Sequence, residues 1–100
     1  MKKFLFSVAA LVMIPASAYA QDACSKIGEL AGTIMKARQA NIPKDTVVAA
    51  ISPGSAYKIS MSLVELAYYT PVYPNEYQKN LSIENFNMQA KYVCYSNFNT

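Results

Sequence analysis

Apolar residues recur at helical spacing in four segments of the chain, starting at residue 22. The first segment, 22–41 (DACSKIGELAGTIMKARQAN), contains one stripe of residues three or four positions apart. The residues of this stripe are Cys24, Ile27, Leu30, Ala31, Ile34, Met35 and Arg38. An amphipathic helix is therefore predicted here, with Asp22 near its start and Asn41 at its end.

Three further helices are predicted between short breaks that contain proline or glycine. Pro43 is placed to open a short helix over 43–52. A third helix, over 55–70, ends before Pro71, because the residue preceding a proline is driven out of helical geometry. This third helix is apolar on two sides, which predicts that it is the central one. The last helix spans 74–95, and its predicted core stripe is Ile83, Phe86, Ala90 and Val93.

The breaks between these segments are two to five residues long, which favours helices that pack against their sequence neighbours. The sequence therefore predicts an all-α fold, a compact bundle of about four short helices in a single domain, 21–100. Gly28 and Gly32 lie one turn apart on the first helix. They indicate either close approach of a neighbouring helix or glycines tolerated on an exposed face.

Residues 1–20 have the pattern of a cleaved signal peptide. Lys2 and Lys3 are basic, residues 4–14 are almost all apolar, and Ala18-Tyr19-Ala20 has the small residues of a cleavage site. The apolar run is shorter than the roughly 20 residues that a membrane span needs, so no retained membrane anchor is expected. The predicted location is the bacterial periplasm or the outside of the cell.

The two cysteines, Cys24 and Cys94, lie near the two ends of the predicted mature domain. A domain of about 80 residues has a small core, and exported proteins meet an oxidising compartment. A disulfide that joins the first and last helices is therefore predicted; the alternative is two unpaired buried thiols. Two cysteines without any histidine cannot complete a four-ligand zinc site, so no metal is expected.

Charge and composition argue against several classes of function. Nine basic residues face six acidic ones, and loss of Lys2 and Lys3 leaves seven against six. Arg38 is the one arginine, so the chain lacks the cluster of basic residues that binds the phosphates of nucleic acid. No histidine or cofactor motif is present, so we expect neither an enzyme nor a bound cofactor. Glu65, within the apolar third helix, is either buried, paired with Lys26, Lys58 or Arg38, or open to solvent.

The segment 67–77 (AYYTPVYPNEY) holds four tyrosines and two prolines. Tyr68 and Tyr77 are predicted to bury their rings at the edge of the core and to keep their hydroxyls in water. Tyr69, Val72 and Tyr73 are the candidates for a rigid exposed patch, since flanking prolines fix the backbone and aromatic residues are enriched in interface hot spots. This patch is the predicted binding site for a protein partner.

Three stretches carry a resemblance: CSKIGELAGTIMKARQANIP (24–43), LVELAYYTPVYPNEYQ (63–78) and the closing KYVC (91–94). In these the chain resembles small exported proteins of bacteria and prophages whose function is unknown. In size, helicity, export and single disulfide it is also similar to periplasmic acid-stress chaperones and to immunity proteins against cell-wall amidase effectors. It lacks the dense charge of those chaperones.

These observations together predict a non-enzymatic periplasmic or secreted binding protein of the immunity, inhibitor or accessory type. The alternative is a small periplasmic chaperone that exposes its apolar helices under stress.

Overall fold

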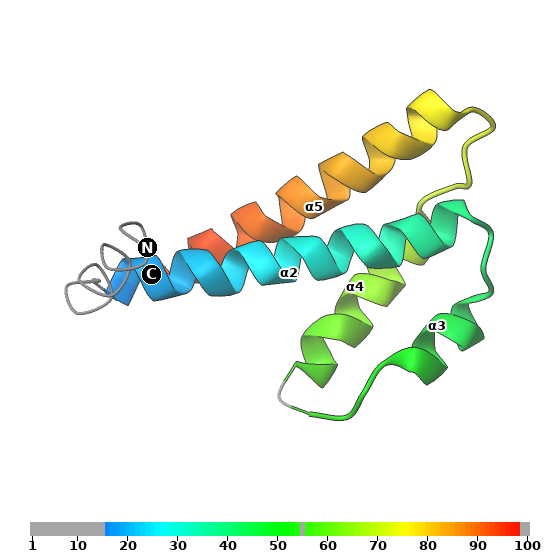
Figure 1. Cartoon of the computed structure of the whole chain (residues 1–100). Helices are drawn as coiled ribbons and strands as arrows, with labels where there is room; N and C mark the ends of the chain where they lie inside the picture. The colour runs from blue at the N-terminus through cyan, green and yellow to red at the C-terminus, as the bar shows by residue number, and fades with distance from the viewer. Residues whose placement is uncertain (1–15, 55, 99–100) are drawn as a thin grey trace, which may run out of the picture.

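Four α-helices make up most of the residues that the structure describes. The computed structural model describes residues 16–54 and 56–98, and these contain no strand. The helices are α2 (Ala16–Gln39), α3 (Lys44–Ala50), α4 (Tyr57–Tyr69) and α5 (Glu76–Phe98) (Figure 1). The predicted all-α bundle of about four helices is confirmed. Two of the helices are long, with 24 residues in α2 and 23 in α5.

The first helix starts earlier than predicted. α2 begins at Ala16, six residues before Asp22. Residues 1–15, which carry the basic and apolar parts of the predicted signal peptide, lie outside the described residues. The cleaved signal peptide therefore stays a prediction.

The ends of the helices follow the local signals in the sequence. Asn41 has a φ of 64°, in the left-handed region that asparagine tolerates better than most residues. The Asn41 and Ile42 N–H groups donate to the carbonyls of Arg38 and Ala37, which closes α2 with a Schellman-type pattern. α4 ends at Thr70, whose backbone is extended immediately before Pro71. The break predicted at each of these positions is confirmed.

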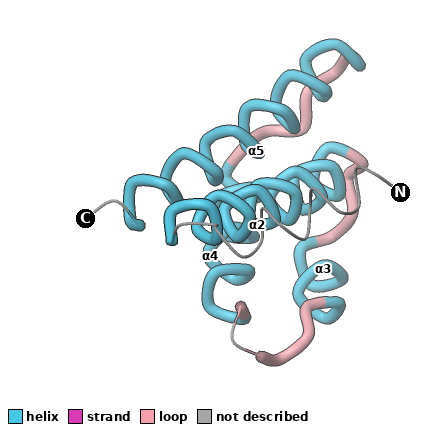
Figure 2. Tube along the Cα trace, turned by 60° about the vertical axis from the view of Figure 1, so that its left-hand side comes forward, coloured by secondary structure: helices cyan, strands magenta, loops and turns pink. Residues whose placement is uncertain are grey.

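The helix at the centre of the fold is α2, and the prediction that 55–70 holds that place is wrong. α2 packs along α5, which runs antiparallel to it, and also against α4, which crosses it on another side (Figures 1 and 2). α3 lies beside α4. Because α2 is almost twice the length of α4, it can bury residues against both neighbours. α4 buries one side and leaves Leu66 56% exposed.

The core forms where α2, α4 and α5 meet. Its buried residues come from all three helices: Ala31, Ile34, Met35, Leu63, Val64, Ala67 and Phe86. α3 adds partly buried Val47 and Val48 from its side. Within the predicted core stripe of the last helix, Phe86 is buried and Ile83 and Ala90 are partly buried. Val93 is 57% exposed, which contradicts its predicted place in the core.

A disulfide joins the first and last helices, as predicted. Cys24 of α2 and Cys94 of α5 are bonded, with their Cα atoms 5.4 Å apart and 70 residues between them in the sequence. Both cysteines are buried. The bond therefore connects the N-terminal half of α2 to the C-terminal part of α5.

At Gly28 the helices α2 and α5 approach closely. A Cβ atom placed on Gly28 would lie 2.6 Å from Asn87 Oδ1 and 3.0 Å from the Asn87 backbone oxygen. At Gly32 the nearest atom would be Asn87 Nδ2 at 3.5 Å, an ordinary contact distance. Close approach of a neighbouring helix, one of the two predicted roles of these glycines, is therefore confirmed for Gly28.

Candidate functional site

The connection between α4 and α5 is held by side chains from the end of α2. Gln39 is 3% exposed, and its side-chain amide bridges two backbone groups of the connection. Gln39 Nε2 donates to the Pro71 carbonyl at 2.8 Å, and Gln39 Oε1 accepts from the Tyr73 N–H at 2.9 Å. The amide thus forms one hydrogen bond with the connection on each side of Val72, and these two bonds hold the connection in place.

Two cations complete this attachment. Arg38 Nε donates to the Thr70 carbonyl at 2.8 Å. Lys79 Nζ, from the first turns of α5, donates to the Gln39 backbone carbonyl at 2.8 Å. Each bond joins a charged donor to a carbonyl, and such charge-assisted bonds are stronger than neutral ones. The last turn of α2 is therefore fastened both to the connection and to the start of α5.

Tyr68 packs against the same end of α2. The Arg38 guanidinium carbon lies 5.1 Å from the centre of the Tyr68 ring, and the Tyr68 hydroxyl donates to the Ile42 carbonyl at 2.7 Å. Burial raises the pKa of the Tyr68 phenol, and the positive charge of Arg38 opposes that rise. The phenol therefore stays protonated and keeps its donor role at neutral pH. The predicted place of Tyr68 at the edge of the core is confirmed.

The predicted aromatic patch is divided between two surroundings. Tyr69, at the end of α4, is 85% exposed. Val72 and Tyr73 are half-buried. Tyr73 lines a shallow hollow of about 240 Å³ together with residues of α5, namely Gln78, Leu81, Ser82 and Asn85. Tyr69 does not line this hollow, so the three residues belong to one connection but not to one cavity.

The prediction that Tyr77 buries its ring is wrong, since Tyr77 is 73% exposed. The first turns of α5 rise away from the C-terminal end of α2 (Figures 1 and 2). No other helix therefore covers this side of α5 at Tyr77. The sequence does not reveal this, because the angle between two helices depends on packing further along both of them.

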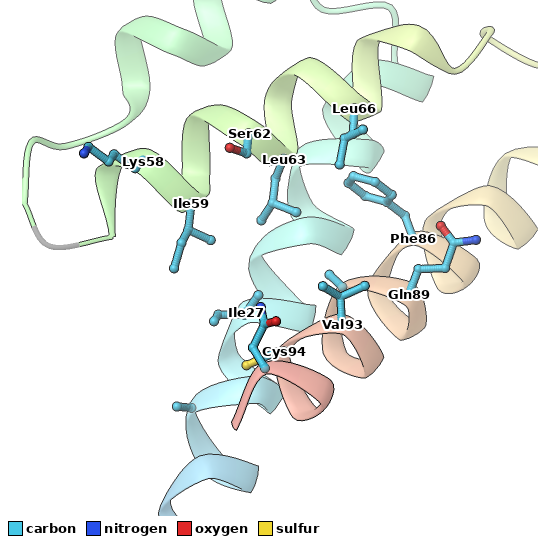
Figure 3. A pocket seen from close by; sticks show the side chains of 13 residues that line it. Ile27, Lys58, Ile59, Ser62, Leu63, Leu66, Phe86, Gln89, Val93 and Cys94 are labelled. Atoms are coloured by element: carbon cyan, nitrogen blue, oxygen red, sulfur yellow. The ribbon is translucent and has the colours of Figure 1, made fainter. Parts of the chain in front are cut away.

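A second feature, which the sequence did not predict, is an apolar groove between α4 and α5. The groove has a volume of about 550 Å³, and part of α2 forms its floor. Its apolar lining includes Ile27, Ile59, Leu63, Leu66, Phe86 and Val93 (Figure 3). In this view Leu66 of α4 points toward the Phe86 ring of α5, and the two helices are further apart at the Ile59 end.

The groove results from the two apolar sides of α4. One side, with Val64 and Ala67, packs into the core, and the other, with Ile59 and Leu66, forms a wall of the groove. The repeated apolar positions in 55–70 are thus the signal for this groove in the sequence. They predict a central helix, whereas in the structure one of the two apolar sides is open.

The charged groups of the described residues are dispersed. Glu65 forms an ion pair with Lys44 at 2.7 Å, and both side chains are partly exposed. The predicted partners Lys26, Lys58 and Arg38 are therefore not used, because α3 places Lys44 beside α4. Within residues 16–54 and 56–98, no three acidic, cysteine or histidine side chains gather in a way that could hold a metal ion.

No family model, curated protein or solved structure matches this chain. In the described part of the chain, none of the helices combines the length and the apolar character required to cross a membrane.

Proposed function

We propose that this protein is a non-enzymatic periplasmic or secreted binding protein that acts by contact with another protein. The observation that carries the proposal is the exposed Tyr69 beside a connection that α2 holds in place. Tyr69 is 85% exposed, and the backbone that follows it is fixed through Thr70, Pro71 and Tyr73. An aromatic side chain on an ordered backbone can bind with little loss of conformational entropy.

The type of partner follows from the same surface. Tyrosine is enriched among the residues that dominate protein interfaces, because its ring offers a large contact area and its hydroxyl a hydrogen bond. Val72 and the hollow beside Tyr73 extend this surface toward α5. An immunity, inhibitor or accessory role fits such a surface, and the resemblance to small exported bacterial and prophage proteins belongs to this proposal.

Export is part of the proposal. The pattern of residues 1–20 is typical of a signal peptide, and disulfides persist in oxidising compartments. The Cys24–Cys94 bond supports a location in the periplasm or outside the cell.

The proposal is tested by affinity capture from periplasmic extract with the tagged, oxidised protein. We expect a captured protein that is lost, or at least tenfold weaker, after Tyr69→Ala combined with Tyr73→Ala, since hot-spot residues each contribute about 2 kcal/mol or more. Truncation of Tyr73 keeps its backbone N–H, so the bond to Gln39 can persist. The matched control is Tyr92→Ala, which removes an exposed tyrosine from α5. Equal capture by both variants would contradict the proposal.

A second candidate function, a small stress chaperone, is favoured by exposed apolar side chains on α4 and α5. Leu66, Met88 and Val93 are each more than half exposed. A chaperone would suppress the aggregation of unrelated unfolded proteins, whereas a dedicated binding protein would not. A light-scattering assay with two unrelated clients separates these functions.

A further inference from the structure

The groove between α4 and α5 has the size and lining of a small-molecule site. Its volume of about 550 Å³ falls in the range of roughly 300–1,000 Å³ that is typical of ligand pockets. Leu63, Phe86 and Cys94 lie deep in the lining and are buried, while Ile59, Leu66 and Val93 are partly open to solvent. A ligand in the groove would therefore cover apolar surface that is now in contact with water.

The volume of the groove favours an alkyl chain over an α-helix as the ligand. A helix with its side chains is a cylinder about 10–12 Å wide that rises 1.5 Å per residue, so this volume would enclose only about one turn. A methylene group occupies a volume similar to that of one molecule in liquid water, which is about 30 Å³. An alkyl chain of about 10–14 carbons therefore fits, with room left at the open side. A helix could rest on the rim of the groove but would not fill it.

The charge at the groove selects the head group of the ligand. Lys58 is the one charged residue among those that line the groove, and it lies at the end where α4 begins (Figure 3). Its side chain points away from the apolar lining in this view, so the ammonium group would turn toward the mouth of the groove to meet a head group. The first turn of α4 carries no acidic side chain, and Lys58 forms no ion pair with any carboxylate of the described residues. A negative group at this end would find an unpaired cation.

We propose that the groove binds the alkyl chain of a fatty-acid anion, with the carboxylate beside Lys58. The chain lies against Ile59, Leu66, Phe86 and Val93, and the head group stays in water at the mouth of the groove. This site is separate from the aromatic connection, and the proposal goes beyond the binding of a protein partner.

The test is calorimetric titration of the oxidised protein with octanoate, decanoate and dodecanoate below their micelle concentrations. We expect saturable binding of one molecule per chain, with a dissociation constant that falls up to about fourfold for each added methylene. Acetate, which lacks the chain, should not bind. Nonyltrimethylammonium, which has the same nine-carbon chain with a cationic head, should bind more weakly than decanoate.

Two pairs of variants assign the binding to this groove. Lys58→Gln should weaken decanoate about two- to fivefold, as expected for an exposed ion pair, and Lys58→Arg should retain its affinity. Val93→Glu places a negative charge in the groove and should abolish binding. Tyr92→Glu places the same charge on the adjacent exposed residue, which does not line the groove, and should leave binding close to that of the unsubstituted protein. Thermal melts of all four variants check that they are folded.

Three kinds of result would overturn the proposal. The first is a titration that fails to assign binding to the groove, either because decanoate does not bind saturably or because Val93→Glu and Tyr92→Glu lose binding equally. The second is a dimer that Val93→Glu disrupts, because the occupant would then be a second copy of the chain. The third is a captured protein partner that is lost with Val93→Glu but not with Tyr69→Ala. Since Tyr69 does not line the groove, capture and titration test the two proposals separately.

Discussion

Gly28 determines how closely α2 and α5 can pack. A methyl group at this position would meet both the side chain and the backbone carbonyl of Asn87. The side-chain oxygen can rotate away, but the carbonyl belongs to the backbone of α5 and cannot move without the helix. Gly32, one turn further on, has room for a methyl group. Both glycines therefore lower the stability of the helix relative to alanine by a similar amount, but only at Gly28 would a larger residue collide with α5.

This difference predicts opposite effects of two identical substitutions. Gly28→Ala should lower the free energy of unfolding by up to about 2 kcal/mol, because overpacking costs about 1–3 kcal/mol and the gain in helix propensity offsets about 1 kcal/mol of it. Gly32→Ala should raise the free energy of unfolding by up to about 1 kcal/mol. Chemical denaturation of the two variants measures both changes. Equal effects, whether gains or losses, would contradict a close approach that is specific to Gly28.

At the scale of the elements, Gln39 connects α2 to the segment that follows α4. Its amide supplies both a donor for the Pro71 carbonyl and an acceptor for the Tyr73 N–H. Gln39→Ala removes both partners from groups that are partly shielded from water. The free energy of unfolding should therefore fall by about 1–3 kcal/mol, and hydrogen exchange at the Tyr73 amide should become faster.

Two further variants isolate the role of this amide. Gln39→Glu keeps an acceptor for the Tyr73 N–H but has no donor for the Pro71 carbonyl, so the exchange rate at Tyr73 should change less than in Gln39→Ala. Gln89→Ala removes an exposed glutamine from α5 that does not line the hollow beside Tyr73, and it should have no effect on that rate. If Tyr73 exchanges at the same rate in Gln39→Ala and in the unsubstituted protein, the connection is held by other contacts.

The C-terminal ends of α2 and α4 could be predicted from the sequence, whereas the angles between the helices could not. Asn41 and Pro71 act on the backbone within one or two residues, so their effect is visible in a short stretch of sequence. The exposure of Tyr77 and Val93 depends on how α5 leans relative to α2 and α4, which many contacts determine together. The aromatic connection was therefore found from sequence, while its attachment to Gln39 and the groove required the structure.

At the scale of the whole molecule, α5 is fastened to α2 at both of its ends. The Cys24–Cys94 bond holds the C-terminal part of α5, and Lys79, with the bonds to the connection, holds its start. Gly28 allows close packing between these two attachments. α4 has fewer such links, since it packs on α2 along one side and leaves the other open to the groove.

The disulfide should contribute much of the stability of this arrangement. It closes a loop of 70 residues, for which the chain-entropy model gives about 4 kcal/mol. A domain of this size is stable by only about 5–10 kcal/mol, so loss of the bond should lower the melting temperature by well over 10 °C. Because the bond lies at one end of the α2–α5 pair, amides in the last turns of α5 should lose protection before those near Asn87.

Intact mass with and without reductant, followed by thermal melts and hydrogen exchange of both forms, checks this prediction. Cys24→Ala combined with Cys94→Ala is the control that removes the bond without a reductant, and it should melt close to the reduced protein. The prediction fails if the exported protein carries two free thiols or if reduction leaves the melting temperature unchanged. A uniform loss of protection along α5 would mean instead that the attachment at Gln39 and Lys79 cannot hold the helix pair without the disulfide.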